Sequence, residues 1–184
     1  MAISTPAALD RTNKLDLRFI GKLVLVFCRI MLGAWMIVSG ASHLLSVFGY
    51  PPIFPQPLGT LHPSNVMLVS LLEVGMFDLV KTVELVVGLC LVFNVFVPLA
   101  LAAALPVSYM VFHNSIVLNL RYDRILSTYM SVWCLYLNLI LILAHIRYYL
   151  PMLRMHAPMG TLSDFKALPS IFEKPRQEPG AGSQ

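Results

Sequence analysis

Four long apolar stretches run along the chain and predict its main structural elements. They cover about residues 23–48, 77–95, 97–118 and 127–150, and each is close to the roughly 20 residues that cross a bilayer as a helix. Only a tight break at Asn94 to Pro98 separates the second stretch from the third, and Pro98 suits a helix start because a first-turn residue needs no N–H. The pattern therefore predicts an all-α, polytopic membrane protein, a four-helix transmembrane bundle in which 77–95 and 97–118 form an antiparallel hairpin.

The connection between the first two spans is rich in proline. Residues 49–59 read GYPPIFPQPLG, and this proline content excludes a helix. Residues 63–73 have a helical pattern opened by Pro63, but together with 77–95 they would be too long for one straight span. We predict a short interfacial or re-entrant helix between the first two spans, with a break near Gly75.

The composition agrees with a chain that lies in lipid. Of the 184 residues, 58% are hydrophobic and 12% are charged, and the mean hydropathy is +0.76, whereas a soluble domain carries about 25% charged residues. The net charge of +4 does not require a nucleic acid, because the basic residues gather in the two flanks of the apolar region. We expect membrane lipids and other membrane subunits as partners, and no nucleic acid.

The basic residues also predict the orientation in the membrane. Eight of the 13 Lys and Arg residues flank the apolar region and a ninth, Arg147, lies at its end, whereas none lies between His43 and Lys81. Short flanks rich in Lys and Arg stay in the cytoplasm. We therefore expect a multi-pass protein of the bacterial inner membrane with both termini in the cytoplasm. It would comprise a basic N-terminal segment (1–22), a transmembrane domain (23–150) and a cytoplasmic tail (151–184).

Ionisable residues inside the spans are candidates for function. A charge within the bilayer costs about 2.5 to 3.5 kcal/mol on insertion scales, so it normally faces the bundle interior. Glu84 is then the natural partner of either Lys81 or Arg29. Two interpretations stay open: an ion pair that only fixes the helix register, and a site that binds a ligand or handles protons.

Small residues share the helix faces that carry these charges. At 100° per residue, Gly33 and Gly40 lie on the side of the first span that holds Arg29, and Gly88 lies on the side of the second span that holds Glu84. Small residues let helix backbones approach closely in membranes. We expect these three glycines at helix contacts.

The outer ends of two spans carry candidates for a small-molecule pocket. His43 and His113 lie near the outer ends of their spans, and Tyr109 and Phe112 lie within one turn of His113. Ligand pockets combine a few placed polar groups with an apolar lining. These four residues are therefore candidates for a quinone or lipid pocket, although histidines that reach for lipid headgroups would explain the same pattern.

Other cofactor chemistries are not predicted. Cys28, Cys90 and Cys134 lie far apart and form no CxxC pair, so we expect small buried side chains rather than a disulfide mechanism. No metal-ligand pattern, nucleotide loop or nucleophile elbow occurs in the chain. His43 and His113 come near one depth, but a single pair without supporting spacing does not predict haem.

Two blocks of the sequence resemble the DoxX-like family of small membrane proteins. The first block is CRIMLGAWMIVSGASHLL at residues 28–45, and the second is KTVELVVGLCLVFNVFVPLALAAALPVSYMVFHNSIVL at residues 81–118. The less generic matching positions are Arg29, Gly33, Gly40, Glu84, Gly88, Pro98, Pro106 and His113. His43 departs from the family pattern, which has a lysine there. The resemblance implies a four-helix bundle, tied in some members to quinone-linked sulfur oxidation or to redox complexes.

The resemblance and the lack of a catalytic motif lead to one functional expectation. We expect an accessory or anchoring subunit of a multi-subunit, quinone-linked redox complex, with a quinone as the candidate small molecule and no catalysis of its own. The alternative is a small membrane oxidoreductase, or quinone-reducing module, that works through Arg29, Lys81, Glu84 and His113. A small-solute carrier is less favoured, because the sequence contains no visible inverted repeat or broken helix pair.

Overall fold

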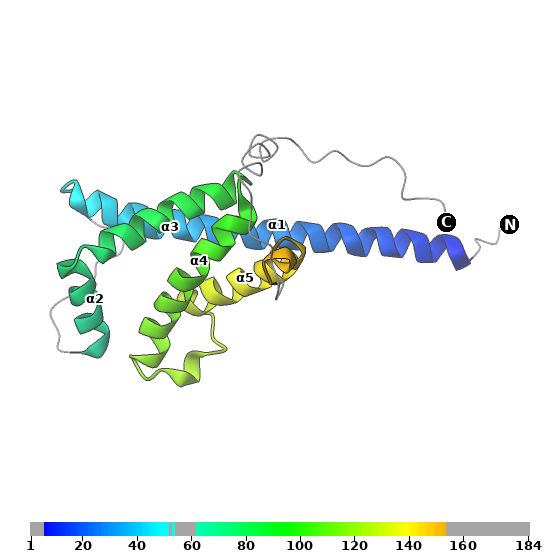
Figure 1. The fold of residues 1–184 in the computed structure, drawn as a ribbon. Helices are drawn as coiled ribbons and strands as arrows, with labels where there is room; N and C mark the ends of the chain where they lie inside the picture. The colour runs from blue at the N-terminus through cyan, green and yellow to red at the C-terminus, as the bar shows by residue number, and fades with distance from the viewer. Residues whose placement is uncertain (1–5, 52, 54–61, 154–184) are drawn as a thin grey trace. The chain divides into compact units, whose positions relative to one another are not determined.

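The computed structural model describes residues 6–51, 53 and 62–153, with side chains from residue 19 onward. Every regular element in these residues is helical, which confirms the prediction of an all-α chain. The α-helices are α1 (Pro6–Val47), α2 (Pro63–Glu73), α3 (Met76–Val92), α4 (Val97–Phe112), α5 (Met130–Ala144) and α6 (Ile146–Tyr149) (Figure 1). A π-helix (His113–Val117) continues α4, and 3-10 turns cover Tyr122–Arg124 and Leu150–Leu153.

Two predicted segments fall mostly outside this range. Of the predicted cytoplasmic tail, 151–184, only residues 151–153 are among the described residues. Most of the proline-rich connection, 49–59, also lies outside the described residues. The first helix begins well before the predicted start of its span, since α1 has 42 residues and includes most of the basic N-terminal segment.

Several helices have the length and composition of membrane spans. Phe19–Val47 and Val97–Val117 each meet both requirements, and Met130–Ala144 with Ile146–Leu153 forms a third span if this bent pair is counted as one. The helix α3 has 17 residues and ends earlier than the predicted stretch 77–95, because the chain turns there toward α4. The described residues therefore hold two or three candidate membrane spans.

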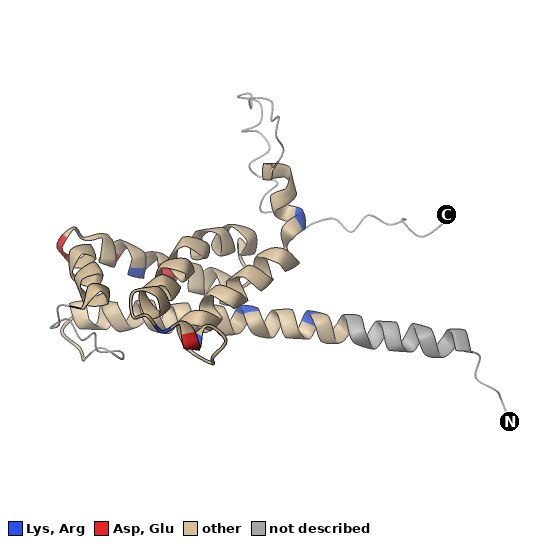
Figure 2. Ribbon diagram, turned by 90° about the horizontal axis from the view of Figure 1, so that it is seen from below, with Lys and Arg blue, Asp and Glu red and all other residues tan. Residues whose placement is uncertain are grey.

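Large apolar side chains cover the outer surface of the helices. Phe19, Phe27 and Leu99 are exposed, whereas Glu84 is only 3% exposed. Figure 2 shows how few Lys, Arg, Asp and Glu residues the described helices carry. Water-soluble domains keep their charges outside, so a buried Glu84 beneath exposed apolar side chains suits helices that face lipid.

Four of the helices contact one another in a closed order. The helix α1 packs along α3, α3 against α4, α4 against α5, and α5 against α1, while α2 lies against α3 (Figure 1). Each of the four contributes a fully buried leucine to the common core, namely Leu32, Leu91, Leu101 and Leu141. This core joins helices that are far apart in the sequence.

The backbones of α1 and α3 meet at three glycines. A Cβ atom on Gly88 would lie 2.7 Å from the carbonyl oxygen of Gly33, and a Cβ atom on Gly40 would lie 2.8 Å from the carbonyl oxygen of Lys81. Real Cβ atoms do not come this close to another atom. The glycines proposed from the sequence for helix packing thus lie where α1 and α3 cross.

Left-handed backbone conformations mark the breaks between helices. Gly75 separates α2 from α3 with a φ angle of 71°, so Pro63–Glu73 is a separate helix and the chain breaks at Gly75 as predicted. Asn94 and Phe96 turn the chain between α3 and α4 with φ angles of 60° and 48°. Because this conformation costs a side-chain-bearing residue about 1 to 2 kcal/mol, the packing of α3 against α4 has to hold the turn.

A buried amide joins α4 to α5 beside a proline. Pro106 lies inside α4 and has no N–H, so this turn lacks one helical hydrogen bond. The fully buried side chain of Asn138 lies 3.3 Å from Ser108 Oγ. In the amide orientation that suits all its neighbours, it also lies 3.3 Å from the carbonyl oxygen of Leu101 and the N–H of Leu105. Asn138 therefore forms hydrogen bonds with polar groups of α4 in the buried core.

Candidate functional site

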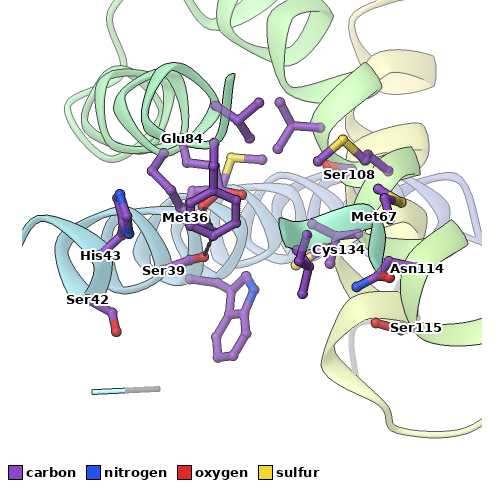
Figure 3. Close-up of a pocket in the computed structure, with 18 of the residues that line it drawn as sticks. Met36, Ser39, Ser42, His43, Met67, Glu84, Ser108, Asn114, Ser115 and Cys134 are labelled. Carbon is purple, nitrogen blue, oxygen red and sulfur yellow. Dashed lines mark hydrogen bonds and ion pairs between the residues drawn. The ribbon is translucent and has the colours of Figure 1, made fainter. Parts of the chain in front are cut away.

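A cavity of about 560 Å³ lies between the helices. Residues from α1, α2, α3, α4, the π-helix and α5 line it (Figure 3). Its volume falls in the range of roughly 300 to 1,000 Å³ that is typical of small-molecule sites. The lining is mainly apolar, with Trp35, Met36, Phe77, Val107 and Met110 among its members.

A buried ion pair forms one wall of the cavity. Lys81 and Glu84 lie three residues apart on α3, a spacing that places two side chains on one helix face. Lys81 Nζ lies 2.8 Å from Glu84 Oε2 and donates a second hydrogen bond of 2.8 Å to Ser39 Oγ on α1. The Lys81 ammonium also lies 5.4 Å from the centre of the Phe77 ring. Of the two partners that the sequence left open for Glu84, the structure brings Lys81 to it.

A second polar pair lies beside the first. His43 Nε2 lies 2.6 Å from Asp78 Oδ1, and the His43 ring meets the edge of the Phe77 ring at a centroid distance of 4.8 Å. Asp78 has a side chain that is 67% exposed, whereas the His43 side chain is mostly buried and lines the cavity. The pair thus connects the cavity wall to the molecular surface, and Phe77 contacts both His43 and Lys81.

The π-helix supplies the polar side chains on another part of the wall. Asn114 and Ser115 both line the cavity. Ser64 of α2 donates a 2.7 Å hydrogen bond to Asn114 Oδ1, and Asn119 Nδ2 donates to the carbonyl oxygen of Asn114. Wide turns of this kind are rare and frequently occur at functional sites. Sequence reasoning missed Asn114, although an amide in an apolar stretch was a signal for it.

Three of the predicted pocket residues lie on a neighbouring face of the same helical stretch. Tyr109, Phe112 and His113 are not among the cavity-lining residues; Tyr109 is 57% exposed, and its ring lies 6.0 Å from that of His113. The cavity face runs through Val107, Met110 or Val111, and then Asn114, which are three and four residues apart as on one helix face. Among the four predicted pocket residues, only His43 lines the cavity.

Arg29 takes part in the turn between α3 and α4 instead of the cavity. Its Nη1 donates a hydrogen bond to Asn94 Oδ1, and Asn94 has the left-handed backbone of that turn. The structure therefore separates Arg29 from the Lys81 and Glu84 pair. Its position explains an arginine near the predicted inner end of the first span (23–48), in the middle of α1, where a guanidinium can fix the adjacent hairpin.

The site is suited to hydrogen bonding with a neutral, mainly apolar molecule. Its wall contains one cation and one anion in contact, and a His43 and Asp78 pair beside them. The thiol of Cys134 is free and faces the cavity. No cluster of three His, Cys, Asp or Glu side chains that could hold a metal ion occurs among the described residues. Comparisons of the chain with protein-family models, with curated proteins and with solved structures find no match.

Proposed function

We propose that this chain is a DoxX-like integral membrane subunit whose helices form a four-helix transmembrane bundle and whose cavity binds a quinone. In this proposal α2 is an interfacial or re-entrant helix, and the protein lies in a bacterial inner membrane with both termini in the cytoplasm. It serves as an accessory or anchoring subunit of a quinone-linked redox assembly. The sequence resemblance supports the family, and the cavity supports the ligand.

The observation that carries this proposal is the Lys81 and Glu84 pair in the cavity wall. A Lys ammonium has three N–H groups, and the bonds to Glu84 and Ser39 use two of them. The third N–H is available to the carbonyl oxygen of a ligand. Since the pair is neutral as a whole, it favours a neutral polar headgroup over an anion or a cation.

The rest of the lining favours a ligand with an aromatic or otherwise flat apolar body. The indole of Trp35 and the ring of Phe77 line the cavity together with Met36 and Met67. Flat apolar rings pack well against aromatic side chains, and methionine adapts to irregular shapes. A quinone headgroup combines such a ring with carbonyl oxygens that accept hydrogen bonds.

Quinone extraction from the purified protein tests the ligand. The protein is isolated from native membranes in mild detergent, and bound quinone is extracted and quantified per chain. We expect about one quinone per chain in the wild type and strong depletion in Lys81→Met. The matched control is Lys22→Met, which removes an exposed lysine outside the cavity. Equal quinone contents in all three proteins, or no quinone in any, contradict the proposal.

The same preparation tests the accessory role. An accessory subunit that is isolated from its native membrane co-purifies with other subunits. The exposed apolar surface of the helices offers a place for those subunits to bind. A lone monomer in mild detergent contradicts the assembly role, whatever its quinone content.

A second candidate function is a quinone-reducing module, and the His43 and Asp78 pair favours it. An imidazole that lines the cavity and contacts an exposed carboxylate can pass a proton between the surface and a bound ligand. In that case Glu84 and Lys81 take part in turnover. A Glu84→Gln variant that retains full quinone reductase activity in a reconstituted membrane eliminates this candidate and leaves the accessory role intact.

A further inference from the structure

Hydrogen-bonding groups face the cavity from two separate walls. Ser39 and Glu84 come from α1 and α3, whereas Asn114 and Ser115 come from the π-helix. Figure 3 shows these two groups on different sides of the cavity, with Met36 beside Glu84 and Ser39 and with Cys134 between the two groups in this view. A ligand that spans the cavity therefore meets a polar group at each end and apolar side chains in the middle.

The amide of Asn114 presents a donor to this cavity. Its Oδ1 accepts the 2.7 Å hydrogen bond from Ser64 Oγ. A carboxamide has two N–H donors on the opposite side of the group from its oxygen. With the oxygen engaged by α2, the Nδ2 group is the part of Asn114 that remains for a ligand, and it requires an acceptor.

The opposite wall also presents a donor. Two N–H groups of Lys81 are used by Glu84 and Ser39, which leaves the third for an acceptor on the ligand. Donors left unpaired in an apolar site cost free energy, so a ligand that pairs both of them binds better than a ligand that pairs one.

We infer that the cavity selects molecules with hydrogen-bond acceptors on two opposite edges of a flat apolar ring, as in a para-quinone. Lys81 donates to one acceptor, and the amide of Asn114 donates to the other. This inference rests on the proposed function and narrows it. A ligand with one carbonyl and the same alkyl tail satisfies Lys81 and leaves the amide of Asn114 unpaired. Asn114 of the π-helix therefore determines the preference for the ligand with two carbonyl groups over the ligand with one.

Tryptophan fluorescence provides a direct test, because the chain has two tryptophans and only Trp35 lines the cavity. The protein is placed in lipid nanodiscs as Trp133→Phe, so that Trp35 is the sole reporter. The probes are a decyl-substituted para-benzoquinone and an aryl ketone with one carbonyl and the same tail. Quinones quench indole fluorescence on contact, and the ketone is measured by its competition with the quinone. The Trp35→Phe variant, which retains Trp133, measures quenching by quinone that is merely dissolved in the lipid.

Asn114→Leu and Ser64→Ala form the decisive pair of variants. Asn114→Leu removes the amide donor together with the bond to α2, whereas Ser64→Ala removes only that bond. We expect Asn114→Leu to weaken quinone binding about tenfold, the effect of one lost hydrogen bond to a buried donor, and to change ketone binding by less than about twofold. We expect Ser64→Ala to leave the affinities for both probes within about twofold of the parent.

The outcomes separate the inference from the function on which it rests. Equal weakening by Ser64→Ala and Asn114→Leu overturns the inference, because the amide then acts only by holding α2. Equal losses for quinone and ketone in Asn114→Leu overturn it too, and so does quinone binding that Asn114→Leu leaves unchanged. If Trp35 in Trp133→Phe is quenched no more than Trp133 in Trp35→Phe, the cavity binds no quinone and the proposed function itself fails. Circular dichroism and gel filtration identify any variant that has lost its fold, and Asn114→Ser then replaces Asn114→Leu.

Discussion

The carbonyl oxygen of Gly33 leaves no room for a side chain on Gly88, since a Cβ atom there would lie only 2.7 Å from it. We expect Gly88→Ala to separate α1 from α3 and to destabilise the protein by about 1 to 3 kcal/mol, the usual cost of overpacking. Thermal unfolding in detergent, followed by circular dichroism, measures the change.

Gly21→Ala is the matched control, because the same substitution on α1 meets nothing within 4 Å. We expect it to leave the melting temperature unchanged or slightly higher, since alanine favours a helix over glycine. Equal melting temperatures for Gly21→Ala and Gly88→Ala would show that the helices do not cross at Gly33 and Gly88.

The buried ion pair predicts a non-additive response to mutation. Lys81→Met leaves the carboxylate of Glu84 unpaired in the interior, and we expect a loss of about 3 kcal/mol in the free energy of unfolding. The double variant Lys81→Met with Glu84→Gln removes both charges and should recover most of this loss. A double-mutant cycle measured by reversible denaturation in detergent checks it, and purely additive effects of the two changes contradict direct contact between the side chains.

The break between α2 and α3 depends on backbone conformation alone. Gly75 has a φ angle of 71°, and a Cβ atom there would meet nothing within 4 Å. We expect Gly75→Ala to cost about 1 kcal/mol through strain, and Gly75→Asn to cost less because asparagine tolerates the left-handed region. If chemical unfolding ranks the two variants in the reverse order, the left-handed turn is not the cause.

The proposed orientation predicts which side of the membrane each loop faces. Residue 122 lies between α4 and α5, where the side chain of Tyr122 is exposed, and residue 7 lies at the start of α1. A membrane-impermeant maleimide should label Tyr122→Cys in intact cells and Ala7→Cys only after permeabilisation. Labelling in the reverse pattern would invert the proposed topology, and the unmodified chain reports labelling of the native cysteines.

The parts of the fold that follow from local physics were predictable from the sequence. The bounds of α2 could be predicted from one proline and one glycine, because Pro63 suits a helix start and Gly75 adopts a conformation that other residues avoid. The contact of Lys81 with Glu84 was one of two predicted alternatives. Lys81 lies three residues from Glu84 on the same helix and is therefore nearer to it than Arg29, which lies on another helix.

The cavity was only partly predictable, for a geometric reason. An angle of 100° per residue describes an α-helix, but the stretch after Phe112 follows the i to i+5 pattern, as the bond from the Leu118 N–H to the His113 carbonyl shows. Which face of α4 turns inward depends also on packing against α5 and α2, which sequence periodicity does not define. The prediction therefore chose Tyr109 and His113 where the structure uses Met110 and Asn114.

The wide turn at His113–Val117 also makes this site sensitive to a change in chain length. A turn with i to i+5 bonds holds one residue more than an α-turn, so the loss of a single codon there would let α4 continue as a regular helix. Because the wide turn absorbs its extra residue, the chain beyond the deletion would keep its place in the bundle, and the residues within the turn would change the face that they present. The orientation of Asn114 and Ser115 toward the cavity thus depends on a one-residue difference in chain length, a far smaller step than redesigning the cavity by substitution.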